Sequence, residues 1–307
     1  MRICFFGTPA FAATLLKGLI EAGHIPIAVV TQPDKPQGRS KKAEPSAVKQ
    51  VALDQGLRVF QPFKASDPLF LEELKALKPD LLVVVAYGQI LRLPLLEMAP
   101  LGAINVHASL LPKLRGAAPI QWSIINGELV TGITIMKMSL GMDEGDILLQ
   151  ESCIIDPTWD ADDLKTALIP IAEKTLLQVL KDLPIPVPQN HLEATYAPKL
   201  ELVDSYIDFQ KDAKIIYNHI RGCNKEPGSW TKVVIKGEPK KLKILKASWV
   251  DLEGEPGSIL EWNSKKGIII ACQKGSILLD NVQLEGKKSC PGTLFTLGYC
   301  KDSVKIA

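Results

Sequence analysis

The run LLVVVA at residues 81–86 constrains the fold most, because six successive apolar residues place apolar side chains on both faces of a strand. A strand of this kind needs cover on both sides, which is typical of a parallel sheet between helices. Two further short apolar strands, residues 1–7 and 25–33, flank a segment with apolar residues at helical spacing that ends at Gly23. This strand, helix, strand order predicts parallel pairing through right-handed crossovers.

Two more strand patterns follow, GAINVHAS at 102–109 and TGITIMKMSLG at 131–141. We therefore expect an α/β domain with a mostly parallel sheet over residues 1–185. A proline-rich stretch then predicts a linker over residues 186–206. After it, one helical segment and a succession of short strands predict a small OB-like β-barrel domain over residues 207–307.

Charge is distributed unevenly along the chain. Of its 307 residues, positions 205–307 hold 17 Lys and Arg against 11 Asp and Glu, although the whole chain has a net charge of only +2. The basic excess favours an oligonucleotide-binding barrel, and the alternative is a packing appendage without a ligand. Six scattered cysteines, with no CxxC pair, indicate neither a zinc site nor a disulfide framework. No apolar stretch reaches the roughly 20 residues of a membrane span, so we expect a cytoplasmic protein.

The strand 102–109 carries the first candidate chemistry. Side chains alternate along a strand, which puts Asn105, His107 and Ser109 on one side. Ligands of open α/β sheets bind outside the carboxyl ends of the strands, where this one ends. Asparagine donates hydrogen bonds to an oxyanion and histidine exchanges protons near neutral pH, so the pair suits attack on a carbonyl. The alternative is a core histidine that only satisfies a buried hydrogen bond.

A carboxylate follows in the loop after the next strand. Asp143 lies between Gly141 and Gly145 in a tight loop, where it is either an orienting partner for His107 or a simple turn former. The SLLP stretch at 109–112 provides an apolar, rigid wall for a flat ring.

Other reaction classes lack their motifs. The stretch GTPAFA at 7–12 has one glycine where a dinucleotide fingerprint needs three, and no phosphate-loop lysine follows it. There is no GxSxG elbow, and no cysteine adjoins a histidine in sequence. These absences favour direct transfer between two bound substrates, without a covalent enzyme intermediate.

A cationic segment, QPDKPQGRSKK, follows the second strand. Its Lys35, Arg39, Lys41 and Lys42 would contact the phosphates of a nucleic acid, or they form a solvated charge run.

These motifs together identify a resemblance. GTPAFA, TQPDKPQGRSKK, VVVAYG, INVHASLLPKLRGAAPIQW and TGITIMKMSLGMDEGD, followed by APKL and RGCNKEPGSW, closely resemble the methionyl-tRNA formyltransferases. That family joins a Rossmann-like catalytic domain to an oligonucleotide-binding barrel. The resemblance implies transfer of the formyl group of 10-formyltetrahydrofolate to the amino group of methionyl-initiator tRNA, giving N-formylmethionyl-tRNA for translation initiation.

The resemblance also assigns roles. It implies that Asn105, His107 and Asp143 are catalytic, without a metal, in a monomeric enzyme. The implied folate-binding residues are Ala86, Tyr87, Gly88, Ser109, Leu110, Leu111 and Pro112. The implied tRNA-binding residues are Lys35, Arg39, Lys41 and Lys42. The sequence departs from the family pattern at Ala10, at Glu144 and at Lys225-Glu226.

Related reactions remain as alternatives. A glycinamide ribonucleotide formyltransferase shares the catalytic set but would end near the linker. A sugar-nucleotide formyltransferase, or the hydrolase half of a formyltetrahydrofolate dehydrogenase, would keep the set and change the acceptor side. A non-catalytic RNA-binding protein with an enzyme fold is the alternative from another class.

Overall fold

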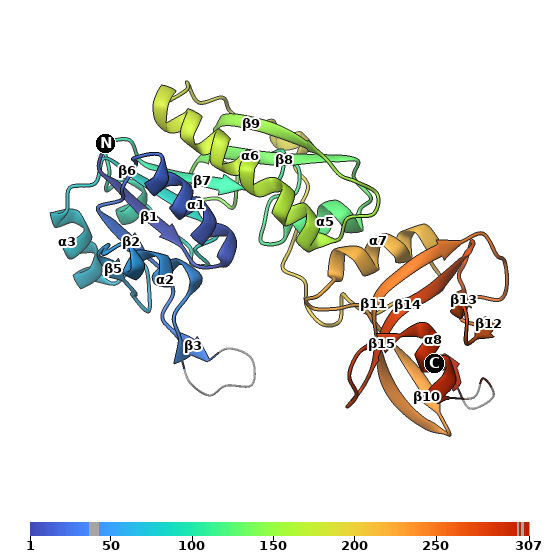
Figure 1. Ribbon diagram of the computed structural model, residues 1–307. Helices are drawn as coiled ribbons and strands as arrows, with labels where there is room; N and C mark the ends of the chain where they lie inside the picture. The colour runs from blue at the N-terminus through green and yellow to red at the C-terminus, as the bar shows by residue number, and fades with distance from the viewer. Residues whose placement is uncertain (37–42, 300, 302–303, 307) are drawn as a thin grey trace. The chain divides into compact units, whose positions relative to one another are not determined.

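The computed structural model describes residues 1–36, 43–299, 301 and 304–306 (Figure 1). Contacts divide the chain into two compact units. The first consists of residues 1–116, 130–154 and 165–196. The second consists of residues 117–129, 155–164 and 197–307.

A seven-stranded sheet forms the centre of the first unit, in the order β5-β2-β1-β6-β7-β8-β9. The strands are β1 (Ile3–Gly7), β2 (Ala28–Val30), β5 (Val59–Phe60), β6 (Leu81–Val85), β7 (Ala103–His107), β8 (Val130–Lys137) and β9 (Ile147–Ile154). The first five strands pair in parallel, and β8 and β9 add an antiparallel edge. The predicted mostly parallel Rossmann-like sheet is therefore confirmed.

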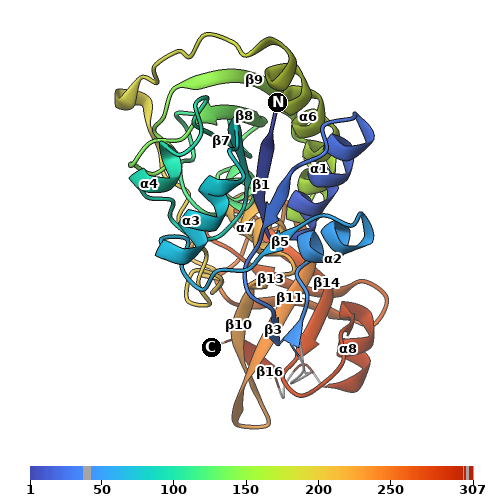
Figure 2. The same ribbon diagram turned by 90° about the vertical axis from the view of Figure 1, so that its left-hand side faces the viewer.

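Helices cover both faces of this sheet. They are α1 (Ala10–Glu21), α2 (Ala47–Asp54), α3 (Pro68–Ala76), α4 (Leu93–Leu96) and most of α6 (Ala161–Asp182). Figure 2 shows α1 and α6 on one face, and α3 and α4 on the other. Phe70 of α3 and Leu95 of α4 belong to the same core cluster as Phe6 and Val84 of the sheet. Cover on both faces explains why every residue of β6 is buried.

A short stem of two strands carries the cationic segment. The strands β3 (Lys35–Pro36) and β4 (Ala43–Glu44) pair antiparallel. The stem is fixed at its end by Ser46, whose hydroxyl accepts a hydrogen bond from Lys49 N at 3.0 Å and caps α2. The same hydroxyl lies 2.6 Å from that of buried Thr31. Ser46 thus joins the stem, α2 and the end of β2.

Replacing Ser46 by alanine is expected to destabilise the start of α2 by about 1 kcal/mol, because it removes the cap and leaves the Thr31 hydroxyl without this partner. Hydrogen exchange at the Lys49 amide should accelerate about fivefold, the equivalent of that free energy. The Ser46→Thr variant keeps the hydroxyl and should stay near the wild-type rate. Equal exchange rates in the wild-type and Ser46→Ala proteins would contradict this role of the cap.

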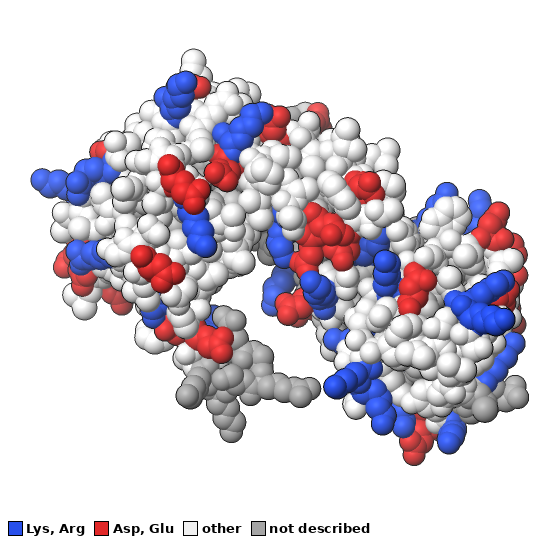
Figure 3. All heavy atoms as spheres, viewed as in Figure 1, with Lys and Arg blue, Asp and Glu red and all other residues white. Residues whose placement is uncertain are grey.

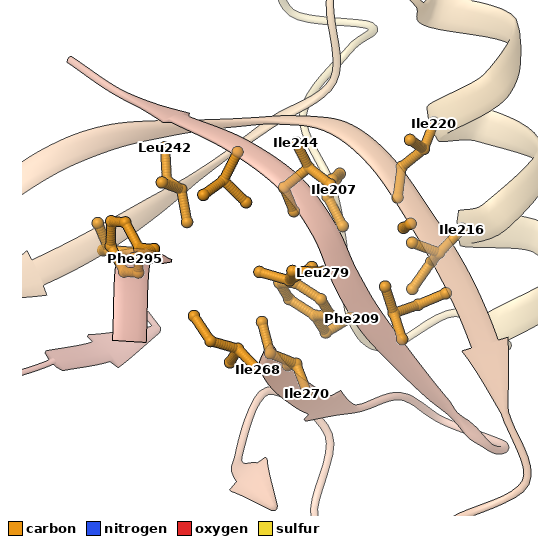
Figure 4. Packing of buried hydrophobic residues seen from close by; sticks show 14 of the residues in the cluster. Ile207, Phe209, Ile216, Ile220, Leu242, Ile244, Ile268, Ile270, Leu279 and Phe295 are labelled. Carbon is orange, nitrogen blue, oxygen red and sulfur yellow. The ribbon is translucent and has the colours of Figure 1, made fainter. Parts of the chain in front are cut away.

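The second unit is an antiparallel, barrel-like sheet in the order β12-β13-β14-β11-β10-β16, with β15 beside β14. The strands are β10 (Trp230–Ile235), β11 (Glu238–Val250), β12 (Ile259–Asn263), β13 (Gly267–Ala271), β14 (Ser276–Leu284), β15 (Cys290–Pro291) and β16 (Val304–Ile306). Its helices are α5 (Pro119–Ile125), α7 (Ala213–Cys223) and α8 (Gly292–Gly298). Figure 4 shows Leu279, Phe209 and Ile270 packed within its core. The predicted OB-like barrel is confirmed.

Two segments that precede residue 185, residues 117–129 and 155–164, belong to this second unit. Gly222 of α7 packs so closely on α5 that an added Cβ would lie 2.5 Å from Ile125 Cγ1. The Trp122 indole donates to Pro198 O at 2.8 Å, and Lys225 Nζ lies 2.7 Å from the Asp162 carboxylate. The units are therefore interleaved in sequence, and the predicted boundaries at 185 and 207 stay predictions.

Candidate active site

The carboxyl ends of β6 and β7 lie side by side and form one edge of the site. At the end of β6, Ala86 and Gly88 both have positive φ, +46° and +86°, and both are exposed. Tyr87 between them points into the core and packs edge to face on Phe6, with ring centroids 5.3 Å apart. Burial raises the pKa of Tyr87 to about 12. Of the three residues predicted to bind folate here, Tyr87 anchors the turn and the other two face outward.

His107 ends β7 and is held by a hydrogen bond at one of its two ring nitrogens. Its Nε2 lies 2.9 Å from the carbonyl oxygen of Leu114. A carbonyl only accepts hydrogen bonds, so Nε2 carries a proton. Nδ1 then faces Asp143 Oδ2 at 3.6 Å, which is too long for a direct hydrogen bond. The Nδ1 edge is therefore the part of the ring that is left for chemistry.

Asn105 lies two residues before His107 on the same strand. It is only partly buried, whereas its neighbours Ile104 and Val106 are 2% and 5% exposed. Strand alternation places the Asn105 amide on the same side as the imidazole, as predicted. The strand ends at His107, so the predicted alternation does not extend to Ser109.

Asp143 comes from the loop between β8 and β9 and has a positive φ of +51°. Its Oδ2 accepts a hydrogen bond from the backbone N–H of Gly116 at 2.8 Å, and the same oxygen faces His107. The loop is tight because Gly145 passes against β8, where an added Cβ would lie 1.9 Å from Lys137 O. The structure thus brings together the predicted histidine and carboxylate from two separate segments.

The SLLP turn is held by hydrogen bonds that the sequence did not indicate. Ser109 Oγ donates to Lys113 O at 2.6 Å, which closes the turn on itself. Thr134 of β8 donates to Ser109 O at 2.6 Å and accepts from Leu111 N at 3.1 Å. Ser109 and Leu111 are buried, whereas Leu110 and Pro112 keep part of their surface. These last two are the members of the turn that can contact a ligand.

A cavity of about 410 Å³ is lined by residues that sequence reasoning missed, namely Ile90, Leu91, Arg92, Leu93, Pro94 and Leu140. These residues lie on the segments that carry Gly88 and Asp143. Ile90 is 80% exposed and Leu140 64%, although both are large and apolar. Apolar side chains at the surface beside a cavity indicate a ligand site. The largely apolar run ILRLPLL, residues 90–96, is the sequence feature that could have indicated this cavity.

Burial disfavours chemistry at two of the cysteines, Cys4 and Cys223. Burial raises the pKa of the Cys4 thiol to about 12 and that of Cys223 to about 11, so both stay protonated at neutral pH.

Within residues 1–36, 43–299, 301 and 304–306, no three His, Cys, Asp or Glu side chains are grouped to hold a metal ion. In the part of the chain that the structure describes, no helix is both long and apolar enough to cross a membrane.

The predicted tRNA-binding residues are described only in part. Lys35 lies exposed in β3, opposite Glu44. Arg39, Lys41 and Lys42 lie outside the described residues. Figure 3 shows several Lys and Arg side chains, with fewer Asp and Glu among them, on the visible face of the second unit.

Comparisons with known proteins agree with this architecture. The family model described as formyl transferase matches residues 1–180, and that described as formyl transferase, C-terminal domain, matches residues 199–299. The methionyl-tRNA formyltransferase of Symbiobacterium thermophilum is 44% identical over 306 residues, covering 97% of this chain and 92% of the relative. That of Citrifermentans bemidjiense is 43% identical over 303 residues, covering 97% and 94%.

Among solved structures, an N-formyltransferase from Helicobacter canadensis in complex with folinic acid and dTDP-3-aminofucose has a TM-score of 0.68. It is 21% identical and covers 91% of this chain and 98% of its own, which shows a shared fold. The two formyl transferase models account for the α/β sheet and for the barrel, and the curated relatives match almost the whole chain. This protein therefore belongs to the methionyl-tRNA formyltransferase family.

Proposed function

We propose that this protein transfers the formyl group of 10-formyltetrahydrofolate to the amino group of methionyl-initiator tRNA, giving N-formylmethionyl-tRNA for translation initiation. The observation that carries the proposal is that His107 Nδ1 lies 3.6 Å from Asp143 Oδ2 at the edge of the first sheet. The sequence relatives of the chain are named methionyl-tRNA formyltransferases. The chain also spans more than nine tenths of each of those relatives, including the C-terminal domain.

The reaction needs no covalent bond to the enzyme. The neutral amine attacks the formyl carbon, the C–N bond to methionine forms, and the bond from that carbon to the folate N10 breaks. The proton lost by the amine passes to N10. Asn105 and His107 bind the oxyanion of the tetrahedral intermediate.

The hydrogen bond of His107 to Leu114 O determines which ring nitrogen can bind the oxyanion. Its Nε2–H donates to Leu114 O, so the ring cannot turn without losing a buried hydrogen bond. With both nitrogens protonated, Nδ1–H donates to the oxyanion while the Asp143 carboxylate balances the charge of the ring. Asp143 also relays the proton towards the departing nitrogen.

The proposed folate-binding residues lie beside Asn105, His107 and Asp143. The proposed folate-binding residues form two turns, Ala86 to Gly88 and Ser109 to Pro112, which end the neighbouring strands β6 and β7. The cavity of about 410 Å³ next to the first turn is apolar and suits a flat pterin ring. Folate is thus expected to contact Leu110 and Pro112 of the second turn, and residues 90–94 beyond the first.

One assay tests the acceptor. The protein is incubated with 10-formyltetrahydrofolate and, in parallel, with methionyl-initiator tRNA, glycinamide ribonucleotide, an amino-sugar nucleotide or water alone. Formylation of the tRNA alone supports the proposal. Formylation of either small amine, or release of free formate at an equal rate, would assign the site to one of the related reactions.

The cationic segment is proposed to bind the phosphates of the tRNA acceptor end. Changing Arg39, Lys41 and Lys42 together to alanine should reduce the slope of log affinity for tRNA against log salt by about 2 to 3, because each lost phosphate contact removes roughly 0.7–0.9. Affinity for the folate should stay unchanged. Binding titrations at several salt concentrations measure both values.

A charge-matched control separates local contacts from total charge. Lys17, Lys64 and Lys75 are exposed in the first unit, and their triple alanine variant removes the same charge. It should leave the salt slope for tRNA nearly unchanged. Equal slopes in the two triple variants would assign the cationic segment to ordinary solvated surface.

Two further properties belong to the same proposal. We expect a monomer, which the molecular mass in solution tests. We also expect the protein in the cytoplasm, where charged initiator tRNA and ribosomes are found.

A further inference from the structure

We propose that Gln189, together with Arg115, is a positioning residue that holds the Asp143 loop in its reactive geometry. This inference rests on the proposed function, because it concerns the same carboxylate. Gln189 lies in the proline-rich stretch predicted as a linker, yet its side chain is buried, with only 6% of the residue exposed. Its Nε2 donates to the backbone carbonyls of Asp143 at 2.9 Å and of Gly145 at 2.7 Å.

The oxygen of the Gln189 amide contacts the buried guanidinium of Arg115. Its Oε1 accepts two hydrogen bonds from the Arg115 guanidinium, from Nε at 3.2 Å and from Nη2 at 2.7 Å. Arg115 is only 3% exposed, and its Nη2 also lies 3.2 Å from His191 Nδ1. A charge in such surroundings is costly unless its donors are satisfied, so this contact fixes both side chains.

The contacts form a closed ring around the carboxylate. Gly116 directly follows Arg115, and its backbone N–H donates to Asp143 Oδ2 at 2.8 Å. Asp143 is therefore held at its carbonyl by Gln189 and at its carboxylate by Gly116. A residue with a φ of +51° needs such support, because the left-handed conformation is strained for a residue with a side chain. The ring sets the direction in which the carboxylate faces His107.

The backbone of residues 186–196 is itself held in the first unit. Val187 and Ile147 exchange two backbone hydrogen bonds of 2.8 Å, which join the segment to β9. Further along, Thr195 O accepts from Arg115 N at 2.9 Å. This part of the predicted linker is thus a structural part of the site, and the amide of Gln189 is presented to the loop from a fixed backbone.

The chemistry of the ring requires an amide of this length. Glutamate at position 189 would keep an acceptor for Arg115 but could not donate to the two carbonyls when ionised. Leucine has nearly the same shape and would lose both functions. The variants Gln189→Glu and Gln189→Leu therefore separate the contact with Arg115 from the contact with the loop.

Steady-state kinetics of the full chain test the inference. Both variants should lower kcat about tenfold to a hundredfold, because a displacement near 1 Å at a reacting group can cost that much. KM for folate and for tRNA should change less than threefold, because the Gln189 side chain is buried and is not among the proposed substrate-binding residues. Retention of kcat within twofold in both variants would overturn the proposal.

A spectroscopic readout excludes a merely structural effect. The chain has four histidines, so the ¹⁵N signals of His107 can be assigned by substitution. Both Gln189 variants should shift the Nδ1 signal of His107, which faces Asp143. The control is Asn190→Ala, which removes the cap of the turn His191–Glu193 but no contact to Asp143, and which should preserve both kcat and the signal.

The outcomes are distinguishable from those for the function itself. If the wild-type protein formylates no tRNA, the proposed function fails, and the His107 signal still decides whether Gln189 positions Asp143. An unchanged signal in Gln189→Leu, or a loss of kcat in Asn190→Ala equal to that in Gln189→Leu, would overturn the positioning role.

Discussion

Alanine at position 107 is expected to lower kcat/KM for formylation at least about a hundredfold, the equivalent of about 3 kcal/mol of transition-state stabilisation. The change removes the imidazole whose Nε2 is fixed on Leu114 O and whose Nδ1 faces Asp143. Asn105→Ala should cost a similar factor, because the amide is the second donor for the oxyanion. Initial rates with saturating folate and varied methionyl-tRNA measure both losses.

Two comparisons make this prediction specific. His24→Ala removes a histidine from the loop after α1 and should keep full activity. The double variant Asn105→Ala, His107→Ala should lose much less than the product of the two single losses, since both groups act on one oxyanion. Near-normal formylation by either single variant would show that the reactive carbon lies elsewhere.

The Gly145→Ala substitution is expected to reduce kcat about a hundredfold, although Gly145 is not one of the proposed substrate-binding residues. The added Cβ would lie 1.9 Å from Lys137 O, a backbone atom of β8, so the loop must move away from the strand. Asp143 is two residues away and would move with it, and Gly145 O would leave Gln189 Nε2. Loss of geometry at this scale costs about two powers of ten.

The matched control is Gly141→Ala in the same loop. The three atoms nearest to a Cβ there all belong to the side chain of Glu144, which is exposed and flexible and can turn away. Its kcat should stay within about threefold of wild type. If both glycine variants lost activity equally, general disorder of the loop would explain the loss better than displacement of Asp143. Single-turnover rates with bound folate measure the chemical step in each variant.

The main elements of the fold were predictable because their patterns are local. The apolar run ending in Val85 could be satisfied only between two layers, and Gly23 marked the end of the first helix with a φ of +84°. The interleaving of the units was not predictable, since it depends on contacts such as that of Gly222 with Ile125. No periodicity along the sequence encodes a contact between residues nearly a hundred positions apart.

The charged and polar catalytic groups of the site could be predicted from the sequence, but the groups that hold them in place could not. His107 and Asp143 are brought together as predicted, because His107 ends one recognisable strand and Asp143 follows another. The Leu114 carbonyl was missed, since every residue has a carbonyl and only the turn of the chain aims this one. Gln189 was missed because a proline-rich stretch looks like a connector even where one amide is buried.

The interleaved chain has a consequence for how such enzymes can be divided or diversified. Because α5 and the residues before α6 pack with α7, a fragment that stops near residue 185 would carry an apolar helix deprived of its neighbour. On the ribosome, the second unit begins with residues 117–129 but cannot be completed until the last strands emerge. Exchange of the barrel for another acceptor module therefore has to bring matching segments into the middle of the enzyme, so recombination at a single junction is a poor route to new specificity.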